Sequence, residues 1–364
     1  MLYLSVSMKK KFQAFLDWFT DNRPQALAGI GAVLIVATSA TAWCLLSQPL
    51  PKLDTTPLYI KPRPPKPKYF SPLDGSPMQN EADGTKPVTA VMIENSPDAR
   101  PQSGLKDGQV IYEAIAEGGI TRFLVLYQQN KPQLVGPVRS IRPYYLDWAA
   151  PYDAAIVHVG GSAEALAQVR GGTFRDMDQF FNGGSFWRVS DRAAPHNVYT
   201  SFEKIDALQA SKGYGTSAPK GIVRKDQKPS GAPTATRINV HISSKTYDSS
   251  YEYDQATNSY KRSQNGEAHT DREKGQLTPK VVVVVKAPMY IEQQRDTWRG
   301  VIETTAGGEA TIFQNGHVVQ CNWSKSAQTE QINFTDANGN AVPLAYGQTW
   351  ITVVPSNNGS VSWQ

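Results

Sequence analysis

Arginine, glutamate and histidine side chains are concentrated between residues 94 and 199 of this 364-residue chain. A guanidinium group is a planar fork that holds a carboxylate or phosphate through paired hydrogen bonds, and a nearby glutamate or histidine can transfer a proton. These residue types predict a cleft for an anionic ligand. The catalytic candidates are Glu113, Glu117 and His196, and the ligand-binding candidates are Arg122, Arg139, Arg142, His158, Ser162, Arg192 and Asn197.

Each candidate also has a structural interpretation, which the sequence leaves open. Glu113 and Glu117 could pair with Arg122, and the remaining arginines could be salt-bridge partners of other carboxylates. His158 lies in an apolar segment, where a histidine is often a hydrogen-bonded core residue. Gly160 and the glycine after it could serve only a tight turn.

Metal and cofactor sites are not predicted. The chain has neither CxxC nor HExxH, and its two cysteines, Cys44 and Cys321, are not part of a His–Cys cluster. Cys44 lies in an apolar segment near the N-terminus, so Cys321 has no partner for a disulfide in the rest of the chain. We interpret Cys321 as a small buried residue.

The elements that must position these side chains alternate between strand and helix patterns, which is typical of an α/β domain. Loops at the carboxyl ends of the strands of such a domain converge on one crevice, and several candidates follow such ends. Strands are predicted over 88–94, 110–115, 121–127 and 154–159, and helices over 162–169 and 201–210.

The second half of the chain predicts an all-β sandwich or barrel. Five consecutive valines at 281–285 indicate a strand that is buried on both faces. Asn-Gly pairs at 265–266, 315–316 and 338–339 are strong signals for hairpin turns. Strands are predicted over 238–242, 250–253, 281–285, 310–313, 318–323, 331–334 and 349–354.

An uncharged stretch from Ala26 to Leu46 is long enough to span a bilayer as a helix. Lys9, Lys10, Lys11 and Arg23 precede it, which favours a cytoplasmic N-terminus although the segment after it is also basic. Cleavage at the A-x-A pattern of residues 40–42 and lipid attachment at Cys44 remain alternatives to a retained anchor. The predicted order is a basic cytoplasmic segment 1–25, a transmembrane signal-anchor helix 26–48, a Pro-rich linker 49–71, an α/β domain 72–215, a linker 216–235, an all-β domain 236–356 and a tail 357–364.

Charge is unevenly distributed along the chain. Residues 1–68 carry nine basic and three acidic residues, or +6, whereas the other residues carry 28 basic and 29 acidic residues, or −1. A nearly neutral folded part argues against nucleic acid as a partner, because nucleic-acid-binding domains usually have a basic face. The basic membrane-proximal region instead fits contact with anionic lipid or an acidic envelope polymer.

Long motifs in both halves carry a family resemblance. They include GluGlyGlyIleThrArgPhe at 117–123, GlyProValArgSerIleArgProTyr at 136–144, AlaProHisAsnValTyrThrSer at 194–201 and GlyGlnThrTrpIle at 347–351. Over about residues 72–356 the chain resembles the YerB-type lipoprotein family, a two-domain family of bacterial envelopes. The resemblance implies location and architecture but no reaction. Trp43 before Cys44 departs from the lipoprotein pattern, so we expect a protein anchor.

These observations predict a single-pass protein of the bacterial cell membrane with a cytoplasmic N-terminus and an extracytoplasmic bulk. The expected function is binding of an anionic envelope ligand (wall glycan, phosphate-containing polymer or lipid headgroup) in the arginine-rich cleft. One alternative is a hydrolase or phosphotransferase acting on a lipid-linked glycan. The strand–turn–strand layout of 121–139 is similar to that of the LytR-CpsA-Psr phosphotransferases, which implies this alternative. A protein-binding scaffold is the other.

Overall fold

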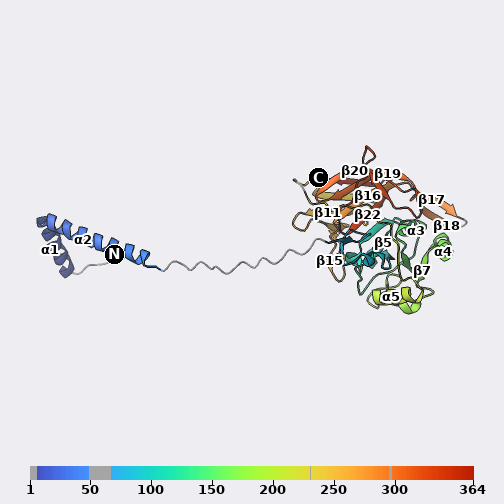
Figure 1. Ribbon diagram of the computed structural model, residues 1–364, viewed down its shortest axis with the longest axis horizontal. Coiled ribbons are helices and arrows are strands. Elements are labelled where there is room, and N and C mark those ends of the chain that lie inside the picture. The colour runs from blue at the N-terminus through green and yellow to red at the C-terminus, as the bar shows by residue number, and fades with distance from the viewer. Residues whose placement is uncertain (1–5, 49–66, 230, 295–296) are drawn as a thin grey trace. The chain divides into compact units, whose positions relative to one another are not determined.

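The computed structural model describes residues 6–48, 67–229, 231–294 and 297–364, and the chain divides into two compact units (Figure 1). The first unit is Met1–Pro64 and the second is Pro65–Gln364. Most of the predicted linker 49–71 lies outside the described residues. All candidate site residues belong to the second unit.

The first unit contains helices α1 (Val6–Asp21) and α2 (Arg23–Leu46), which are separated by Asn22. Proline at the start of α2 is compatible with a helix because its missing N–H would have no partner there. α2 matches the predicted apolar stretch, and an 18-residue window in it has a mean hydropathy of 1.9. By length and composition α2 could cross a bilayer, as cleavable signal sequences also could. α1 is not among the predicted elements, because the sequence indicated only a basic segment there.

The second unit is built on one ten-stranded sheet to which both halves of the chain contribute. β22 of the second half runs parallel to β4 of the first half, with Thr349 opposite Val110 and Thr352 opposite Glu113. In sheet order the strands are β21 (Asn333–Thr335), β20 (His317–Ser324), β19 (Gly307–Gln314), β16 (Val281–Ala287), β22 (Thr349–Pro355), β4 (Val110–Ile115), β5 (Thr121–Tyr127), β3 (Thr89–Glu94), β6 (Ala155–His158) and β7 (Arg175–Asp178).

The predicted fold class, an N-terminal helix followed by an α/β part and an all-β part, is confirmed. The valine strand is β16, and all five valines are buried as predicted. In the pairs Asn265-Gly266 and Asn315-Gly316, both residues have positive φ. A two-residue hairpin turn of type I′ requires this conformation. The third pair differs, because only Gly339 has positive φ and the turn closes on an isolated bridge between Thr335 and Ala341.

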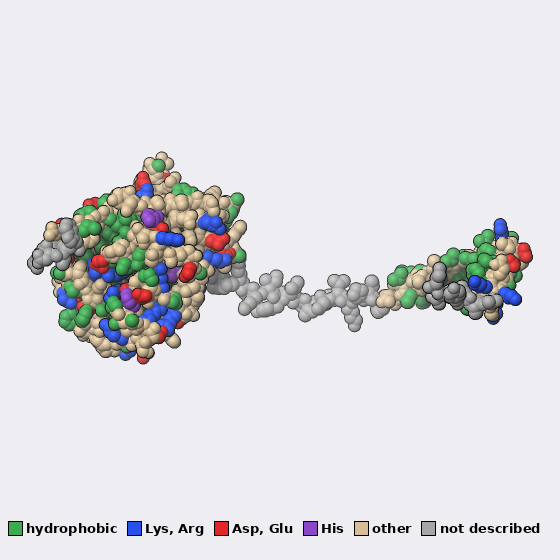
Figure 2. Space-filling model, turned by 180° about the vertical axis from the view of Figure 1, so that it is seen from behind, with side chains coloured by type: hydrophobic (Ala, Val, Ile, Leu, Met, Phe, Trp, Pro, Cys, Tyr) green, Lys and Arg blue, Asp and Glu red, His purple; other side chains and the backbone are tan. Residues whose placement is uncertain are grey.

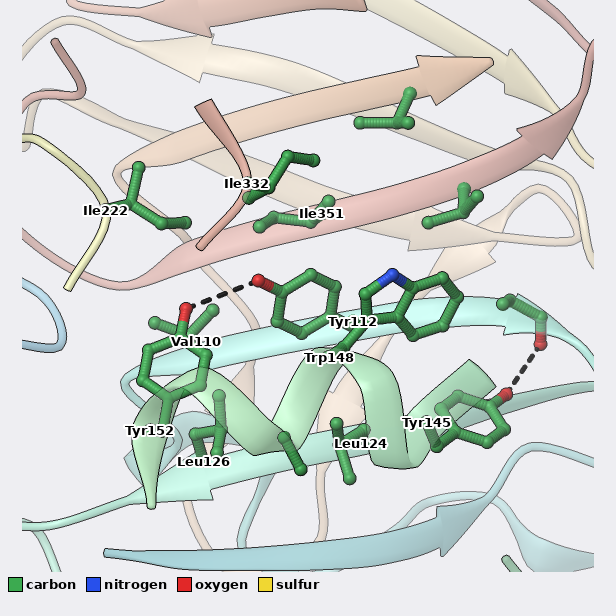
Figure 3. Close-up of a cluster of buried hydrophobic side chains, with 14 of the residues drawn as sticks. Val110, Tyr112, Leu124, Leu126, Tyr145, Trp148, Tyr152, Ile222, Ile332 and Ile351 are labelled. Carbon is green, nitrogen blue, oxygen red and sulfur yellow. Dashed lines mark hydrogen bonds between the residues drawn. The ribbon is translucent and has the colours of Figure 1, made fainter. Parts of the chain in front are cut away.

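Helices α3 (Pro143–Ala149) and α4 (Ala163–Arg170) cover one face of the large sheet. On this face the Trp148 ring of α3 stacks on Tyr112 of β4, with centroids 5.4 Å apart and planes 5° apart. Figure 3 shows both rings between α3 and the side chains of Ile332 and Ile351, which come from the second half. The same core therefore joins the two halves.

The opposite face packs against a five-stranded sheet and helix α5 (Phe202–Ser211). The predicted tail 357–364 contains an edge strand of that sheet, β23, which pairs with β10. In order the strands are β13 (Glu267–Ala268), β12 (Ser259–Gln264), β11 (Ser249–Asp254), β10 (Arg237–His241) and β23 (Ser360–Trp363).

Short elements complete the unit. A two-stranded hairpin that the sequence did not predict, β17–β18, follows β16 after one residue. The predicted linker 216–235 is held against the folded unit, since the Arg224 guanidinium donates to the backbone carbonyls of Leu73 and Ala345. The remaining strands are β1 (Tyr69–Phe70), β2 (Pro77–Met78), β8 (Trp187–Arg188), β9 (Val198–Tyr199), β14 (Thr270–Asp271), β15 (Gly275–Gln276), β17 (Met289–Gln294) and β18 (Thr297–Ile302), and the 3₁₀ turns are Glu81–Thr85, Pro97–Ala99, Leu105–Asp107, Ala150–Tyr152 and Gly183–Ser185.

Candidate functional site

The strand directions bring most of the predicted site residues to one edge of the ten-stranded sheet. β3, β6 and β7 run parallel to one another, and β4 has the same direction because β5 lies antiparallel between β3 and β4. Glu94 ends β3, Glu117 follows β4 and His158 ends β6, so all three lie at the carboxyl ends of parallel strands. We call this edge the carboxyl edge.

Three of the predicted residues form what we call the Glu117 cluster: Glu117, Arg122 and Arg142. Glu117 Oε2 accepts a hydrogen bond of 2.9 Å from Arg122 Nη2, and Glu117 Oε1 pairs with Arg142 Nε. The two arginine side chains are only 9% and 15% exposed, whereas the Glu117 side chain is 48% exposed. A single half-exposed carboxylate therefore bridges two largely buried guanidinium groups.

The ionisation of Glu117 follows from this geometry. Burial alone would raise the pKa of the Glu117 carboxyl, but the positive charges of Arg122 and Arg142 outweigh burial and hold that pKa below its usual value. Glu117 is therefore a fixed anion at neutral pH. Such a carboxylate is a weak proton acceptor and suits a counter-charge better than a catalytic base.

A second group, the Glu94 cluster, consists of Glu94, Ser96, Arg139 and His196. Glu94 Oε1 lies 3.0 Å from His196 Nδ1, 3.2 Å from Arg139 Nε and 3.0 Å from Ser96 Oγ, which donates to it. Ser96 Oγ is also 3.1 Å from His196 Nδ1, so the hydroxyl and the carboxylate share one ring nitrogen. In a Ser–His–acid triad the serine faces the other ring nitrogen, so this arrangement is not a triad.

Backbone contacts of residues 139–142 link the two clusters. Arg139 N donates to the Met92 carbonyl, and the Ser140 carbonyl accepts a 3.1 Å hydrogen bond from Arg122 Nη1. Glu94 and Arg122 are also direct neighbours across β3 and β5. The two clusters are therefore adjacent along the carboxyl edge.

The other ligand-binding candidates have structural partners. His158 is fully buried, with Nε2 3.0 Å from Asp176 Oδ1 and Nδ1 2.8 Å from the Gly160 carbonyl, so both ring nitrogens are occupied. Ser162 caps α4 by accepting from Ala165 N.

Arg192 and Asn197 hold loops. Arg192 Nη2 donates to the Pro101 carbonyl, while Asn197 accepts from Arg188 Nη1 and donates to the Val189 carbonyl. The hydrogen bonds of His158, Ser162, Arg192 and Asn197 therefore hold turns, a helix start and loops in place.

Glu113 is separated from the other candidates by the thickness of the sheet. It shares a face of β4 with Ile111, which packs in the core opposite to that of α3. There Glu113 Oε2 accepts hydrogen bonds from Arg262 Nη2 at 2.7 Å and Trp350 Nε1 at 3.0 Å, and all three side chains are completely buried. The structure thus places Glu113 as a buried ion-pair partner, on the face of the sheet opposite α3.

A cleft of about 630 Å³ opens beside the Glu117 cluster. Its lining includes Glu117 and Arg142, residues of α3 and of the start of α4, and Arg299 to Ile302 of β18. A more apolar hollow of about 550 Å³ is lined by the same four residues of β18, by Met289 to Ile291 of β17 and by Glu117. We call the larger hollow the carboxyl-edge cleft.

Charge pairs line this cleft. Arg299 pairs with Glu164 of α4 and Glu292 of β17, and Asp147 of α3 accepts hydrogen bonds from Thr304 and Gln328. On the face shown in Figure 2, basic and acidic side chains likewise lie interleaved. Of the four arginines predicted to bind an anion, Arg142 lines this cleft. Arg122, Arg139 and Arg142 are each already paired with a carboxylate, whereas Arg192 donates to backbone carbonyls.

Glu94 of the Glu94 cluster and two residues that line the cleft, Glu164 and Arg299, were missing from the sequence prediction. The available signal for Glu94 is its position at the end of a predicted strand. Arg299 and Glu164 come together because the β17–β18 hairpin folds over the start of α4. The two residues are 135 positions apart in the chain. No local pattern reports a contact over that separation.

Comparison with known proteins gives the same architecture. The N-terminal and C-terminal domains of a family described as "Protein of unknown function (DUF3048)" match residues 73–215 and 238–351. The "Putative lipoprotein YerB" of Bacillus subtilis (strain 168) is 35% identical over 293 residues, covering 79% of this chain and 87% of that protein. The crystal structure of the YerB protein from Bacillus subtilis aligns with a TM-score of 0.72 and 31% identity over 81% of this chain and 100% of that chain. The resemblance that the motifs indicated is confirmed, and this chain belongs to the YerB-like family with the two DUF3048 domains.

Proposed function

We propose that this chain is a membrane-anchored protein of the bacterial envelope whose second unit lies outside the cytoplasm and binds an anionic ligand in the carboxyl-edge cleft. The apolar helix α2 and the description of the Bacillus subtilis relative as a lipoprotein support membrane attachment. The bulky Trp43 before Cys44 favours attachment through α2 over attachment through a lipid. The basic segment before α2 favours a cytoplasmic N-terminus.

The observation that carries the binding proposal is the position of the Glu117 carboxylate. It is the exposed member of the Glu117 cluster, and its two arginine partners are largely buried and fixed. A carboxylate or phosphate group that enters the cleft can take its place on Arg142 as Glu117 swings towards solvent. Wall glycans and phosphate-containing polymers of the envelope offer such groups, as do lipid headgroups.

The geometry favours binding over catalysis. Glu117 is held as an anion, Glu113 is sealed on the other face of the sheet, and the His196 Nδ1 atom is shared by Glu94 and Ser96. None of these three is arranged as a proton-transfer group that faces the carboxyl-edge cleft. The charge pairs instead provide an exchangeable site for an acid group.

Two substitutions in this cluster are expected to change binding in opposite directions. Arg142→Gln should raise the Kd for purified poly(glycerol phosphate) about ten- to a hundredfold, because a hydrogen bond to a charged group contributes about 1.5–3 kcal/mol. Glu117→Gln should lower that Kd by up to about tenfold, because it removes the carboxylate that competes with the ligand for Arg142. A tenfold change in Kd corresponds to about 1.4 kcal/mol of binding free energy. Isothermal titration calorimetry of the full-length protein in detergent would measure both.

The matched control is Arg272→Gln, which removes an exposed guanidinium paired with Asp191 away from the cleft. It should leave the Kd unchanged, and uncharged dextran should bind none of the variants. Weaker binding in Glu117→Gln, to the same extent as in Arg142→Gln, would contradict displacement of Glu117. Unchanged binding in Arg142→Gln would contradict the site.

A further inference from the structure

Helix α1 places most of its large apolar side chains on a single face. At about 100° per residue, Met8, Phe12, Phe15 and Phe19 fall within an arc of about 60°, with Leu16 beside them. The rings of Phe15 and Phe19 lie 6.2 Å apart, so the face is a continuous aromatic surface. Phe12 is 64% exposed and Phe15 is 55% exposed. Among the described residues, therefore, this face remains largely uncovered.

The opposite face of α1 is polar, and its charges have a defined order. Lys10 and Asp17 lie opposite the aromatic residues, while Lys9 and Lys11 flank the aromatic face on its two sides. Lysine side chains at the borders of an apolar face can bury their stems and keep their ammonium groups in water. This is the pattern of a helix that lies in the plane of a membrane surface.

The position of α1 in the chain identifies which surface it can reach. α1 ends at Asp21 and α2 begins at Arg23, so a single residue separates the two helices. If α2 crosses the bilayer, the end of α1 must lie at the membrane boundary. With three lysines and two aspartates in 16 residues, α1 itself is too polar to span.

We propose that α1 lies flat on the cytoplasmic leaflet of the membrane that α2 crosses, with its aromatic face in the acyl boundary and its lysines against anionic lipid headgroups. The inference rests on the membrane anchoring in the proposed function. The cytoplasmic leaflet carries anionic lipid that attracts such basic segments, and burial of the apolar face adds to this attraction. α1 is thereby an interfacial helix that lies in the membrane plane and directly precedes the spanning helix α2.

Site-directed spin labelling of the full-length protein in phosphatidylglycerol-containing nanodiscs tests this placement. Labels are attached at Phe15→Cys on the aromatic face, Asp17→Cys on the polar face and Ala37→Cys within α2, each in a Cys44→Ser background. The ratio of accessibility to oxygen over accessibility to a water-soluble nickel chelate is then measured. The ratio should be severalfold higher at residue 15 than at residue 17, and highest at residue 37.

The three labels distinguish failure of the in-plane position of α1 from failure of the anchoring by α2. Equal, water-like ratios at residues 15 and 17 with a lipid-like ratio at residue 37 would overturn the in-plane helix and leave the anchor intact. A water-like ratio at residue 37 would overturn the anchor and with it the in-plane helix. Spin–spin broadening between residue-15 labels would show that a second copy covers the face instead of lipid, and would also overturn the proposal.

A charge variant tests the headgroup contact. Replacing Lys9, Lys10 and Lys11 together by Gln should reduce the contrast between residues 15 and 17 in phosphatidylglycerol nanodiscs to the value seen in nanodiscs of phosphatidylcholine alone. The matched variant Lys68→Gln, which removes a lysine outside α1, should leave the contrast unchanged. An unchanged contrast in the triple variant would contradict a role for anionic lipid.

Discussion

Replacing Arg262 by Ala is expected to lower the free energy of unfolding of the second unit by about 3–5 kcal/mol, because it leaves the Glu113 carboxylate buried without its counter-charge. Glu113, Arg262 and Trp350 are all completely buried, and the Arg262 guanidinium also lies over the Trp350 ring, 4.4 Å from its centroid. These side chains come from β4, β12 and β22, so the network joins the two sheets. Urea unfolding of residues 65–364, followed by circular dichroism, would measure the change.

The controls for this prediction separate charge from packing. Glu113→Leu combined with Arg262→Met removes both charges and should cost much less than either single change, since apolar residues of similar volume can replace a buried ion pair at little cost. Lys261→Ala, at the exposed neighbouring position that pairs with Asp254, should change stability by less than about 1 kcal/mol. A loss from Arg262→Ala as small as that from Lys261→Ala would contradict the buried pair.

Replacing Trp148 by Ala is expected to cost about 3–5 kcal/mol of unfolding free energy, because a buried aromatic side chain leaves a large cavity. Trp148 is 4% exposed and packs on Tyr112 and on Tyr145, whose ring lies at 5.5 Å and nearly perpendicular to it. Figure 3 shows the Trp148 ring beside that of Tyr112. Trp148→Phe keeps an aromatic ring and should cost less than half as much. Similar losses in both variants would contradict cavity formation as the cause.

The fold was predictable wherever the signal is local. The five valines of β16, the apolar runs of β3 to β5 and the Asn-Gly turns at 265–266 and 315–316 each specify an element from a few neighbouring residues. The parallel pairing of β22 with β4 joins residues more than 200 positions apart, and the sequence of neither strand indicates which strand it pairs with. The single ten-stranded sheet therefore could not be inferred from the sequence.

The candidate site was predictable in part for the same reason. The candidates were expected to converge on one crevice because several of them follow strand ends, and Glu117, Arg122 and Arg142 do meet. Glu113 was grouped with the other candidates, although the alternation of side chains along β4 puts it on the face of Ile111. Its partner Arg262 follows 149 residues later, so no local pattern indicates the pair. The aromatic face of α1 was present in the sequence, but the three lysines drew the interpretation towards a plain basic segment.

Binding of an anionic ligand by the Glu117 cluster is tested by isolation of the full-length protein from its own membranes, followed by analysis of the bound anionic glycan and phosphate. An anionic envelope compound should copurify with the unmodified protein, be enriched with Glu117→Gln and be lost with Arg142→Gln. Equal recovery with all three proteins would contradict a binding site in the Glu117 cluster.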